Sequence, residues 1–372
     1  MTVYAHINTV PNGSTGGIMM REHRELLAAG NDSYVFWGRG RDAEDDHECK
    51  FASDIGVKID VLQTRLDGRA GFHSEQATKR LLAYLDRINP DVVHLHNLHG
   101  YYLNIAMLFD WLAHHDCKVE WTLHDCWAFT GHCAYFTYVG CSQWQSHCAR
   151  TEPCPQLNAY PKTFCKSSCA KNFEDKRRLF TRIPAERMTL VTPSCWLEGL
   201  VKKSFLRQYP VVVRHNEIDR TVFKPTPSDF KERVGIGDRF MILGVASPWT
   251  ERKGLGDFMR LARELDSERF AIVLVGLSKR QIDELPDGII GIMRTDSQRE
   301  LAEIYTAADL FFNPTREDNF PTVNLEAEAC ETPVITYDTG GCYETIQLRG
   351  SGVINGYRSA RMAIEDEQRK VR

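Results

Sequence analysis

The sequence predicts an α/β protein of two domains, each built on a parallel sheet. Strand-like apolar runs alternate with amphipathic helical patterns along the whole chain, which is typical of parallel sheets with crossover helices. With 372 residues, the chain is too long for one ordinary hydrophobic core. Ten of its 12 cysteines and all 13 histidines precede residue 216, so the two halves differ in chemistry.

Composition excludes several classes of protein. A formal net charge of −4 argues against a generally basic nucleic-acid-binding protein, so we expect no nucleic acid partner. No apolar stretch approaches the roughly 20 residues that span a bilayer. The N-terminus opens with a strand-like run in place of a charged and then apolar signal, and we therefore expect a cytoplasmic protein.

The first predicted strand, residues 3–7, leads through a glycine-rich loop at 12–17 into an amphipathic helix over 18–29. Gly16 and Gly17 lie in this strand-to-helix loop, where the lack of a side chain lets a phosphate or a sugar approach the backbone. The loop lacks the spacing of the dinucleotide fingerprint and has no Walker lysine. Neither a dehydrogenase nor a P-loop ATPase is therefore predicted.

Histidines follow the next predicted strand of this half. His94 and His96 alternate onto one face, where neighbouring imidazoles serve as metal ligands, acid–base groups or packed core donors. We expect His94 to pack in the core. His99 lies further into the loop and is the better placed to meet a ligand, on the acceptor side of the site.

A further apolar strand, residues 118–123, stops at His124 and Asp125. The carboxyl ends of the strands are the edge at which open α/β sheets bind ligands. A neighbouring carboxylate there fixes the tautomer of an imidazole. A structural histidine and a ligand-binding one are both compatible with this pattern.

A cysteine-rich insertion, residues 131–169, interrupts the α/β rhythm. A long loop without a core of its own needs a staple, and in a reducing compartment thiolate coordination of zinc serves better than disulfides. We expect a structural zinc ion held by four thiols, those of Cys133, Cys141, Cys148 and Cys154. Buried free thiols or disulfides are the alternatives. Catalytic zinc is not indicated, because the pattern offers no open three-ligand site with a base.

Basic residues mixed with apolar ones recur over residues 162–178 and 201–207. Such runs usually coat a solvated face. The functional alternative is peripheral attachment to anionic lipid at the inner face of a membrane, which a lipid-linked acceptor would explain.

A polar, proline-containing segment after residue 215 marks a change of domain, and we place the boundary so that the domains cover residues 1–225 and 226–372. The second domain begins with a strand over 240–246. Arg252 and Lys253 follow it, before a helix over 255–265. Two cations in a strand-to-helix loop can neutralise a diphosphate that leaves as a glycosidic bond breaks.

The stretch from Asp318 to Glu326 places two carboxylates at the end of one strand and inside the next helix. The start of that helix offers free backbone N–H groups and the positive end of a dipole, which suit a diphosphate or sugar hydroxyls. A Thr-Gly-Gly sequence follows at residues 339–341.

This segment resembles the E-x7-E region of retaining glycosyltransferases of the GT-B fold, in the group often called GT4, with aspartate in place of glutamate at residue 318. The cysteine pattern is similar to that of a subgroup that assembles bacterial polysaccharides of the colanic-acid type. The resemblance implies two Rossmann-like domains facing across a cleft, of which the second holds the nucleotide sugar.

The same resemblance implies roles for particular residues. Lys253 and Arg252 would stabilise the diphosphate, and Glu326 would hold the ribose. Asp318, with the backbone at Asn319 and Phe320, would orient the donor sugar. Four further positions follow from the matching motifs: His124 beside the reacting carbon, Gly16 and Gly17 against the phosphates, and Arg294 in the turn that reads the base.

The predicted function is transfer of a hexosyl unit from a nucleotide-diphosphate sugar, with UDP-sugar as the expected donor, to a saccharide or lipid-linked saccharide acceptor. The anomeric configuration of the sugar would be retained, and the product would serve surface polysaccharide assembly. No strand ends in an Asp-x-Asp motif, so we expect no metal cofactor in catalysis. The alternatives are a nucleotide-sugar epimerase on the same fold and a zinc-stapled scaffolding subunit without activity.

Overall fold

The computed structural model describes residues 1–165 and 167–370. The chain divides into two compact units, Met1–His215 and Asn216–Arg372. The division falls ten residues before the boundary predicted from the sequence, because the segment after His215 belongs with the second unit. Phe223 and Phe230 of that segment are buried in the second unit's core.

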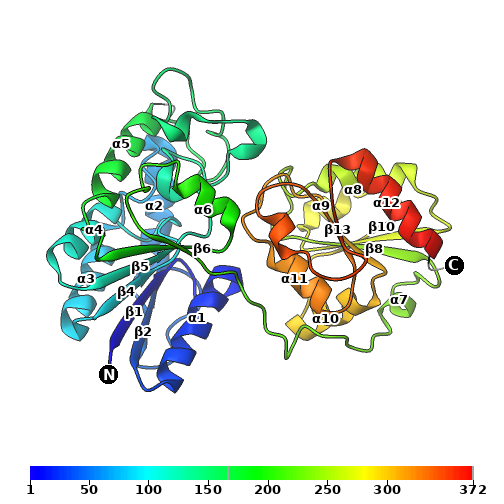
Figure 1. The fold of residues 1–372 in the computed structure, drawn as a ribbon, viewed down its shortest axis with the longest axis horizontal. Coiled ribbons are helices and arrows are strands. Elements are labelled where there is room, and N and C mark those ends of the chain that lie inside the picture. Colours follow the sequence, from blue (N-terminus) through cyan, green and yellow to red (C-terminus); the bar gives the residue numbers. More distant parts are fainter. Residues whose placement is uncertain (166, 371–372) are drawn as a thin grey trace. The chain divides into compact units, whose positions relative to one another are not determined.

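The first unit is built on a seven-stranded parallel sheet of order β3-β2-β1-β4-β5-β6-β7 (Figure 1). Its strands are β1 (Val3–Asn8), β2 (Asp32–Trp37), β3 (Glu48–Lys50), β4 (Val92–Leu95), β5 (Lys118–Thr122), β6 (Met188–Thr192) and β7 (Val211–Val213). Its helices are α1 (Gly13–Ala28), α2 (Asp54–Asp67), α3 (Glu75–Ile88), α4 (Ile105–His114), α5 (Ser168–Phe180) and α6 (Cys195–Val201).

The second unit carries a six-stranded parallel sheet of order β10-β9-β8-β11-β12-β13. Its strands are β8 (Phe240–Val245), β9 (Phe270–Val275), β10 (Ile289–Ile292), β11 (Leu310–Asn313), β12 (Val334–Tyr337) and β13 (Gly352–Ile354). Its helices are α7 (Phe230–Arg233), α8 (Leu255–Glu264), α9 (Lys279–Asp283), α10 (Gln298–Ala307), α11 (Thr322–Ala329) and α12 (Tyr357–Lys370). Two parallel-sheet units confirm the predicted α/β class.

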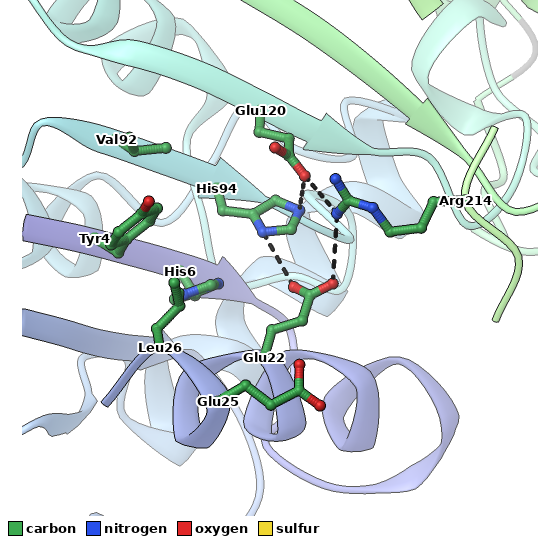
Figure 2. Close-up of a pocket in the computed structure, with 9 residues that line it drawn as sticks. All are labelled: Tyr4, His6, Glu22, Glu25, Leu26, Val92, His94, Glu120 and Arg214. Atoms are coloured by element: carbon green, nitrogen blue, oxygen red, sulfur yellow. Dashed lines mark hydrogen bonds and ion pairs between the residues drawn. The ribbon is translucent and has the colours of Figure 1, made fainter. Parts of the chain in front are cut away.

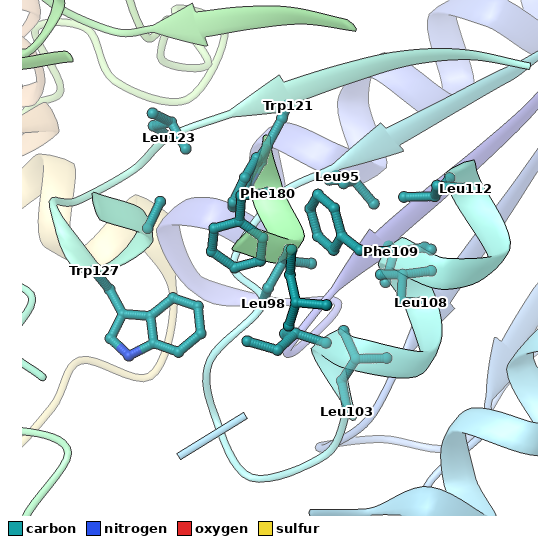
Figure 3. Packing of buried hydrophobic residues seen from close by; sticks show 14 of the residues in the cluster. Leu95, Leu98, Leu103, Leu108, Phe109, Leu112, Trp121, Leu123, Trp127 and Phe180 are labelled. Atoms are coloured by element: carbon teal, nitrogen blue, oxygen red, sulfur yellow. The ribbon is translucent and has the colours of Figure 1, made fainter. Parts of the chain in front are cut away.

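The core of the first unit lies between the sheet and helices α3, α4 and α5. Phe109 of α4 and Phe180 of α5 pack on Trp121 of β5, with ring centroids 5.5 and 4.9 Å from it (Figure 3). Each fully buried large apolar side chain of this kind contributes about 1.5–3 kcal/mol. The opposite face of β1 and β4 carries His6 and His94, since successive side chains of a strand alternate between faces.

The cysteine-rich insertion is packed into this core, contrary to the expectation of a loop without a core. It follows the short 3-10 turn Trp127–Phe129, forms two further 3-10 turns, Thr137–Val139 and Gln143–Gln145, and ends in the first turn of α5, which begins at Ser168. Phe129, Phe136 and Trp144 are buried, and their ring centroids lie 4.9–6.2 Å apart. These aromatic side chains hold the insertion against the sheet.

Several element limits differ from the sequence prediction. Helix α1 begins at Gly13, so the predicted glycine loop forms its first turn. A helix, α2, fills residues 54–67, and a last helix, α12, covers the charged C-terminal stretch 357–370. In the part of the chain that the structure describes, no helix is both long and apolar enough to cross a bilayer.

Candidate functional site

Three loops of the second unit meet at the carboxyl ends of β8, β11 and β12. The backbone N–H of Arg316, after β11, donates to the carbonyl of Arg252, after β8, over 2.7 Å. The Thr339 hydroxyl, after β12, donates to the carbonyl of Thr315 over 2.7 Å. This is the edge at which the ligands of open α/β sheets bind.

Two glycines permit this close packing. A Cβ atom on Gly340 would lie 1.9 Å from the carbonyl oxygen of Asp318, and one on Gly254 would lie 2.4 Å from that of Pro314. Both glycines also have positive φ values, 59° and 78°. The Thr-Gly-Gly sequence therefore supports the loop that carries Asp318, and the Gly341 N–H donates to the Asp318 carbonyl over 3.0 Å.

Lys253 and Asp318 form the charged centre of this edge. The Lys253 ammonium donates to the Asp318 carboxylate, and the Arg252 guanidinium lies 3.9 Å from the same carboxylate oxygen. Burial acts to raise the pKa of Asp318, but the charges of Lys253 and Arg252 outweigh it and hold this pKa below its usual value. Asp318 is therefore ionised and fixed between two cations.

Asn319 and Phe320 follow directly and are buried, with 3% and 6% exposure. The backbone N–H of Asn319 donates to the Asp318 side chain over 2.9 Å, which turns the carboxylate back toward its own loop. Helix α11 begins two residues after Phe320, at Thr322.

Glu326 lies on α11, and its carboxylate accepts a hydrogen bond from the Tyr305 hydroxyl of α10 over 3.1 Å. Burial raises the pKa of Glu326 to about 7, against hydrogen bonds from Tyr305 and Thr322 that lower it. A carboxyl with such a pKa is typical of a functional site. Tyr305 was missed by the sequence analysis, because nothing local distinguishes it from a core tyrosine.

Arg294 is separate from this group. It is exposed in the turn after β10, the edge strand of the sheet. Within residues 1–165 and 167–370, no hydrogen bond or ion pair links Arg294 to Lys253, Asp318 or Glu326.

In the first unit, Gly16 and Gly17 lie in the first turns of α1. Gly16 is buried, and a Cβ atom there would lie 2.5 Å from the carbonyl carbon of Pro11, so this glycine allows the helix to start against the loop. Gly17 is exposed with no heavy atom close to its Cβ position. The N-cap residue, Asn12, makes no side-chain cap, which leaves N–H groups of the first turn for a ligand.

Two pairs of side chains, each with at least one histidine, meet at the carboxyl ends of β4 and β5. His99 Nε2 lies 2.8 Å from the Asp125 carboxylate, and His96 Nδ1 lies 3.1 Å from His124 Nε2. Burial lowers the pKa of His124 to about 4, so at neutral pH its ring is neutral and exchanges hydrogen bonds without adding charge. The sequence analysis named His99 and His124 but not the pairing of His96 with His124.

The cysteines of the insertion are all free thiols and lie near one another. Cys154 accepts hydrogen bonds from Cys133 and from Cys169, a residue outside the predicted zinc set, and these bonds lower the pKa of the Cys154 thiol. Cys141 and Cys148 are near enough for a charge on Cys154 to raise their thiol pKa values further, beyond the effect of burial. The ammonium of Lys176 is buried nearby and donates to the carbonyls of Trp127 and Thr130.

Comparison with known proteins defines the class. Residues 239–365 match the family model described as Glycosyl transferases group 1. The whole chain resembles solved glycosyltransferase structures. Its alignment with sucrose-phosphate synthase from Thermosynechococcus elongatus covers 98% of this chain and 89% of that one, with a TM-score of 0.72 and 15% identity. The chain therefore has the GT-B fold and carries a glycosyl transferase group 1 domain in its second unit.

Particular relatives are more distant or partial. The chain is 28% identical over 195 residues to the putative colanic acid biosynthesis glycosyl transferase WcaC of Escherichia coli K12. It is 31% identical over 170 residues to the alpha-galactosylglucosyldiacylglycerol synthase of Streptococcus pneumoniae R6. These alignments cover 49% and 41% of this chain, and 46% and 44% of the respective relatives. The chain thus spans about half the length of the curated relatives that it matches. HepE of Anabaena, solved with UDP and glucose, gives a TM-score of 0.63 at 12% identity, with 100% of this chain and 90% of that one covered.

Proposed function

We propose that this protein is a retaining glycosyltransferase. It would transfer a hexosyl unit from a nucleotide-diphosphate sugar, UDP-sugar in first place, to a saccharide or lipid-linked saccharide in surface polysaccharide assembly. The observation that carries the proposal is the joining of Lys253, Arg252 and Asp318 at the carboxyl ends of β8 and β11, inside the region that matches the glycosyltransferase family. The UDP complexes of HepE support a uridine nucleotide.

Lys253 and Arg252 stabilise the leaving diphosphate in this proposal. Breaking the bond between sugar and phosphate places developing negative charge on the diphosphate, and fixed cations at that point lower the barrier. Asp318 holds both cations in place through the contacts described above, and it presents its second carboxylate oxygen toward the backbone of Asn319. We infer that these protein cations replace a divalent metal in catalysis.

Glu326 takes the ribose hydroxyls. Tyr305 donates to Oε2 of this carboxylate, and the Thr322 side chain also hydrogen-bonds to it, so both residues hold the carboxylate in place for hydroxyl donors. Because its pKa is about 7, Glu326 is partly protonated at neutral pH, and ribose hydroxyls that donate to it would favour the ionised form.

The first unit supplies imidazole side chains. His124 contacts the sugar near the reacting carbon, and His96 Nδ1 beside its Nε2 fixes how the ring is protonated. His99, held by Asp125, serves the acceptor side. Gly16 and Gly17 let the phosphates approach the first turn of α1. The thiol cluster of the insertion is proposed as a structural zinc site of the first unit, with no part in the chemistry.

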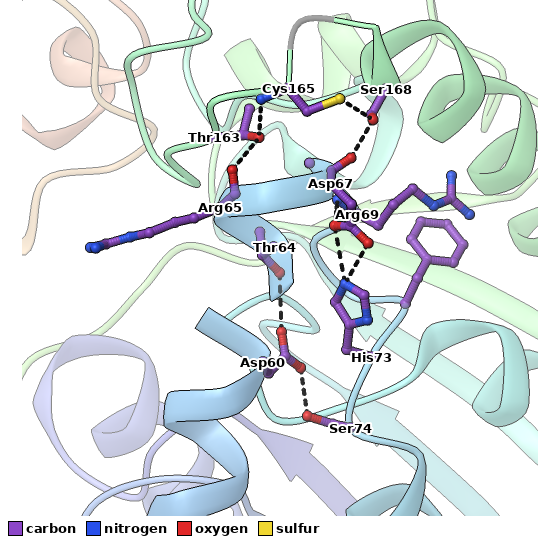
Figure 4. Close-up of polar contacts among 12 residues, drawn as sticks. Asp60, Thr64, Arg65, Asp67, Arg69, His73, Ser74, Thr163, Cys165 and Ser168 are labelled. Atoms are coloured by element: carbon purple, nitrogen blue, oxygen red, sulfur yellow. Dashed lines mark hydrogen bonds and ion pairs between the residues drawn. The ribbon is translucent and has the colours of Figure 1, made fainter. Parts of the chain in front are cut away.

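Peripheral membrane contact is supported by an apolar stripe on α2. The side chains at i, i+4, i+7 and i+11 of this helix are exposed by 52–72%: Ile55, Ile59, Leu62 and Leu66. Phe164, 79% exposed, is held beside the end of α2, because its N–H donates to the Arg65 carbonyl. The Thr163 hydroxyl donates to the same carbonyl (Figure 4). Exposed Lys58, Arg65 and Lys162 flank the stripe, so an anionic lipid surface is the partner that fits both features.

Donor turnover by the purified full chain tests the catalytic proposal. We expect UDP release from a UDP-hexose that depends on an added saccharide or lipid-linked acceptor and persists in EDTA, with the α-anomeric configuration of the donor kept in the product by NMR. Lys253→Ala should lower kcat by roughly 10²–10³. Lys279→Ala, an exposed lysine of α9 in the same unit, should leave it unchanged. UDP-hexose turnover without any acceptor would point to an epimerase, and full activity in Lys253→Ala would contradict the proposal.

Vesicle flotation tests the membrane contact separately. We expect the wild-type chain to float with vesicles rich in anionic lipid and the double variant Ile59→Ser, Leu62→Ser to remain at the bottom. A double variant on the exposed face of the second unit, Lys279→Ser with Arg280→Ser, is the control for general charge and should float like wild type. Equal flotation of both variants would refute the role of α2.

A further inference from the structure

A group of three imidazoles and one carboxylate lies inside the first unit, next to His124 and distinct from the thiol cluster. His6 of β1, His94 of β4, His96 just after β4 and Glu22 of α1 each direct one ligand atom to a common point, and these four atoms lie within 4.8 Å of one another. Figure 2 shows Glu22 reaching from α1 toward the His6 and His94 rings. The residues come from three elements that are far apart in the sequence.

Strand register brings the histidines together. β1 and β4 are parallel neighbours in which His6 pairs with His94, so both side chains project from the same face of the sheet. His96 lies two residues further on and therefore projects from that face as well. Helix α1 covers this face and supplies Glu22, which stands next to the buried His23 and about one helix turn after the buried Met19.

The inward-facing atoms lack ordinary hydrogen-bond partners. Both ring nitrogens of His6 and the Nε2 of His96 are buried without any hydrogen bond, and the two residues are each 1% exposed. Leaving buried polar atoms unpaired costs about 1–3 kcal/mol each. One nitrogen of His6 and Nε2 of His96, buried beside a carboxylate without hydrogen-bond partners, are explained by an ion that accepts one lone pair from each ring.

His94 and His96 each face Glu22 with one nitrogen and hold a partner outside the group with the other. His94 Nδ1 lies 3.1 Å from Glu22 Oε2, while its Nε2 lies 2.8 Å from the Thr122 hydroxyl and 3.7 Å from Glu120. His96 Nε2 lies 3.8 Å from the same Glu22 oxygen, while its Nδ1 lies 3.1 Å from His124 Nε2. Metal-binding histidines characteristically bind the metal with one nitrogen while the other donates to a carboxylate, hydroxyl or similar acceptor.

Charge and access also fit a cation. The second oxygen of Glu22 lies 3.8 Å from Arg214, which is paired with Glu120 at 2.7 Å (Figure 2). Two carboxylates thus balance one guanidinium and leave a negative charge for a metal. The group borders a pocket of about 330 Å³ whose lining includes Tyr4, Glu25 and Leu26, and this pocket supplies an entry path.

We propose that His6, Glu22, His94 and His96 form a binding site for a divalent transition-metal ion, with Zn²⁺ as the cation that best suits three imidazoles and a carboxylate. Tetrahedral zinc with bonds of about 2.0–2.1 Å places its ligand atoms roughly 3.3–3.4 Å apart. The 3.1 and 3.8 Å separations at Glu22 bracket that value. Metal on His96 Nε2 leaves the proton of this ring on Nδ1, where it donates to His124, so the ion also fixes the orientation of that histidine.

Cobalt substitution distinguishes this site from the thiol cluster. The full chain is produced in minimal medium with Co²⁺, and bound metal is measured by mass spectrometry, visible absorption and X-ray absorption at the cobalt edge. We expect one cobalt ion per chain that has nitrogen and oxygen neighbours, in addition to any cobalt held by thiolates. Any cobalt in the thiol cluster adds thiolate-to-metal charge transfer, which then serves as an internal measure of folding.

Glu22→Gln and His6→Gln are the test variants, and Glu25→Gln is the matched control on the same helix and the same pocket. We expect the two test variants to lose the nitrogen–oxygen-bound cobalt, with at least about tenfold weaker binding, while Glu25→Gln keeps it. The His6 variant decides the matter if the Glu22 variant fails to fold, and the reverse also holds. A purely thiolate spectrum in the wild-type chain, no bound cobalt at all, or equal cobalt in all the folded variants would overturn the proposal.

Discussion

Replacement of Glu326 by glutamine should make the second unit more stable at alkaline pH and the protein less active. The carboxyl has a pKa of about 7, raised by burial from its ordinary value of 4.5. Between those values the folded protein binds more protons than the unfolded one, so the free energy of unfolding falls as the pH rises from 4.5 to 7. Below pH 4.5 this cost is absent, and above pH 7 it is complete.

The magnitude follows from the same pKa. At about 1.4 kcal/mol for each pKa unit, a rise from 4.5 to about 7 corresponds to about 3 kcal/mol at pH 8. Glutamine has the shape of glutamate and keeps an oxygen for the Tyr305 hydroxyl, but it carries no charge to bury. Glu326→Gln should therefore match the wild type near pH 4.5 and exceed its stability by about 3 kcal/mol at pH 8.

Hydrogen exchange of the β9 and β11 amides is the appropriate assay, because it reports the opening of the second unit by itself. Glu284→Gln is the control: this glutamate of the same unit is 58% exposed, and its pair with Arg280 is worth at most about 0.5 kcal/mol. An equal change in opening free energy at pH 5 and pH 8 would refute the reasoning, since a pH-independent effect leaves no room for a raised carboxyl pKa. Loss of donor turnover together with the gain in stability would identify Glu326 as a residue kept for function.

Three further outcomes follow from the contacts. Gly340→Ala should lower the free energy of unfolding by about 1–3 kcal/mol and weaken UDP binding in calorimetry, because its Cβ would meet the Asp318 carbonyl. Gly352→Ala, with open space at its Cβ, is the control and should leave UDP binding unchanged. Asp125→Asn should lower the free energy of unfolding measured in urea at pH 7. Burial acts to raise the pKa of Asp125, but His99 and His124 outweigh it and hold this pKa below its usual value. The difference in stability from wild type should therefore shrink as the pH falls below about 4. Tyr305→Phe removes a hydrogen bond that lowers the Glu326 pKa, so the pH at which hydrogen exchange shows the stability loss should move upward, and an unchanged profile would contradict the contact.

Much of the second unit was predictable from local pattern. Strand β8 and helix α8 begin at the predicted residues, 240 and 255, because apolar periodicity and turn residues report burial directly. Polar residues that follow such strands must lie at the ligand-binding edge, which is why Lys253 and Asp318 could be named. The start of α1 was misplaced, since the glycines at residues 13, 16 and 17 read as a loop, whereas they form the first turns of a helix in which Gly16 packs against Pro11.

The sequence by itself determined the class of fold, the alternation of strand and helix, and the kinds of charged residue at the strand ends, because each depends on neighbours a few positions away. Only the tertiary structure decided which of these residues meet. Lys253 and Asp318 are 65 residues apart and come together because β8 and β11 are neighbours in the sheet. His6 meets His94 because β1 lies beside β4, and the raised pKa of Glu326 arises from its burial beside Tyr305. Strand order and burial are set by the free energy of the whole packed unit, which no local stretch of sequence contains.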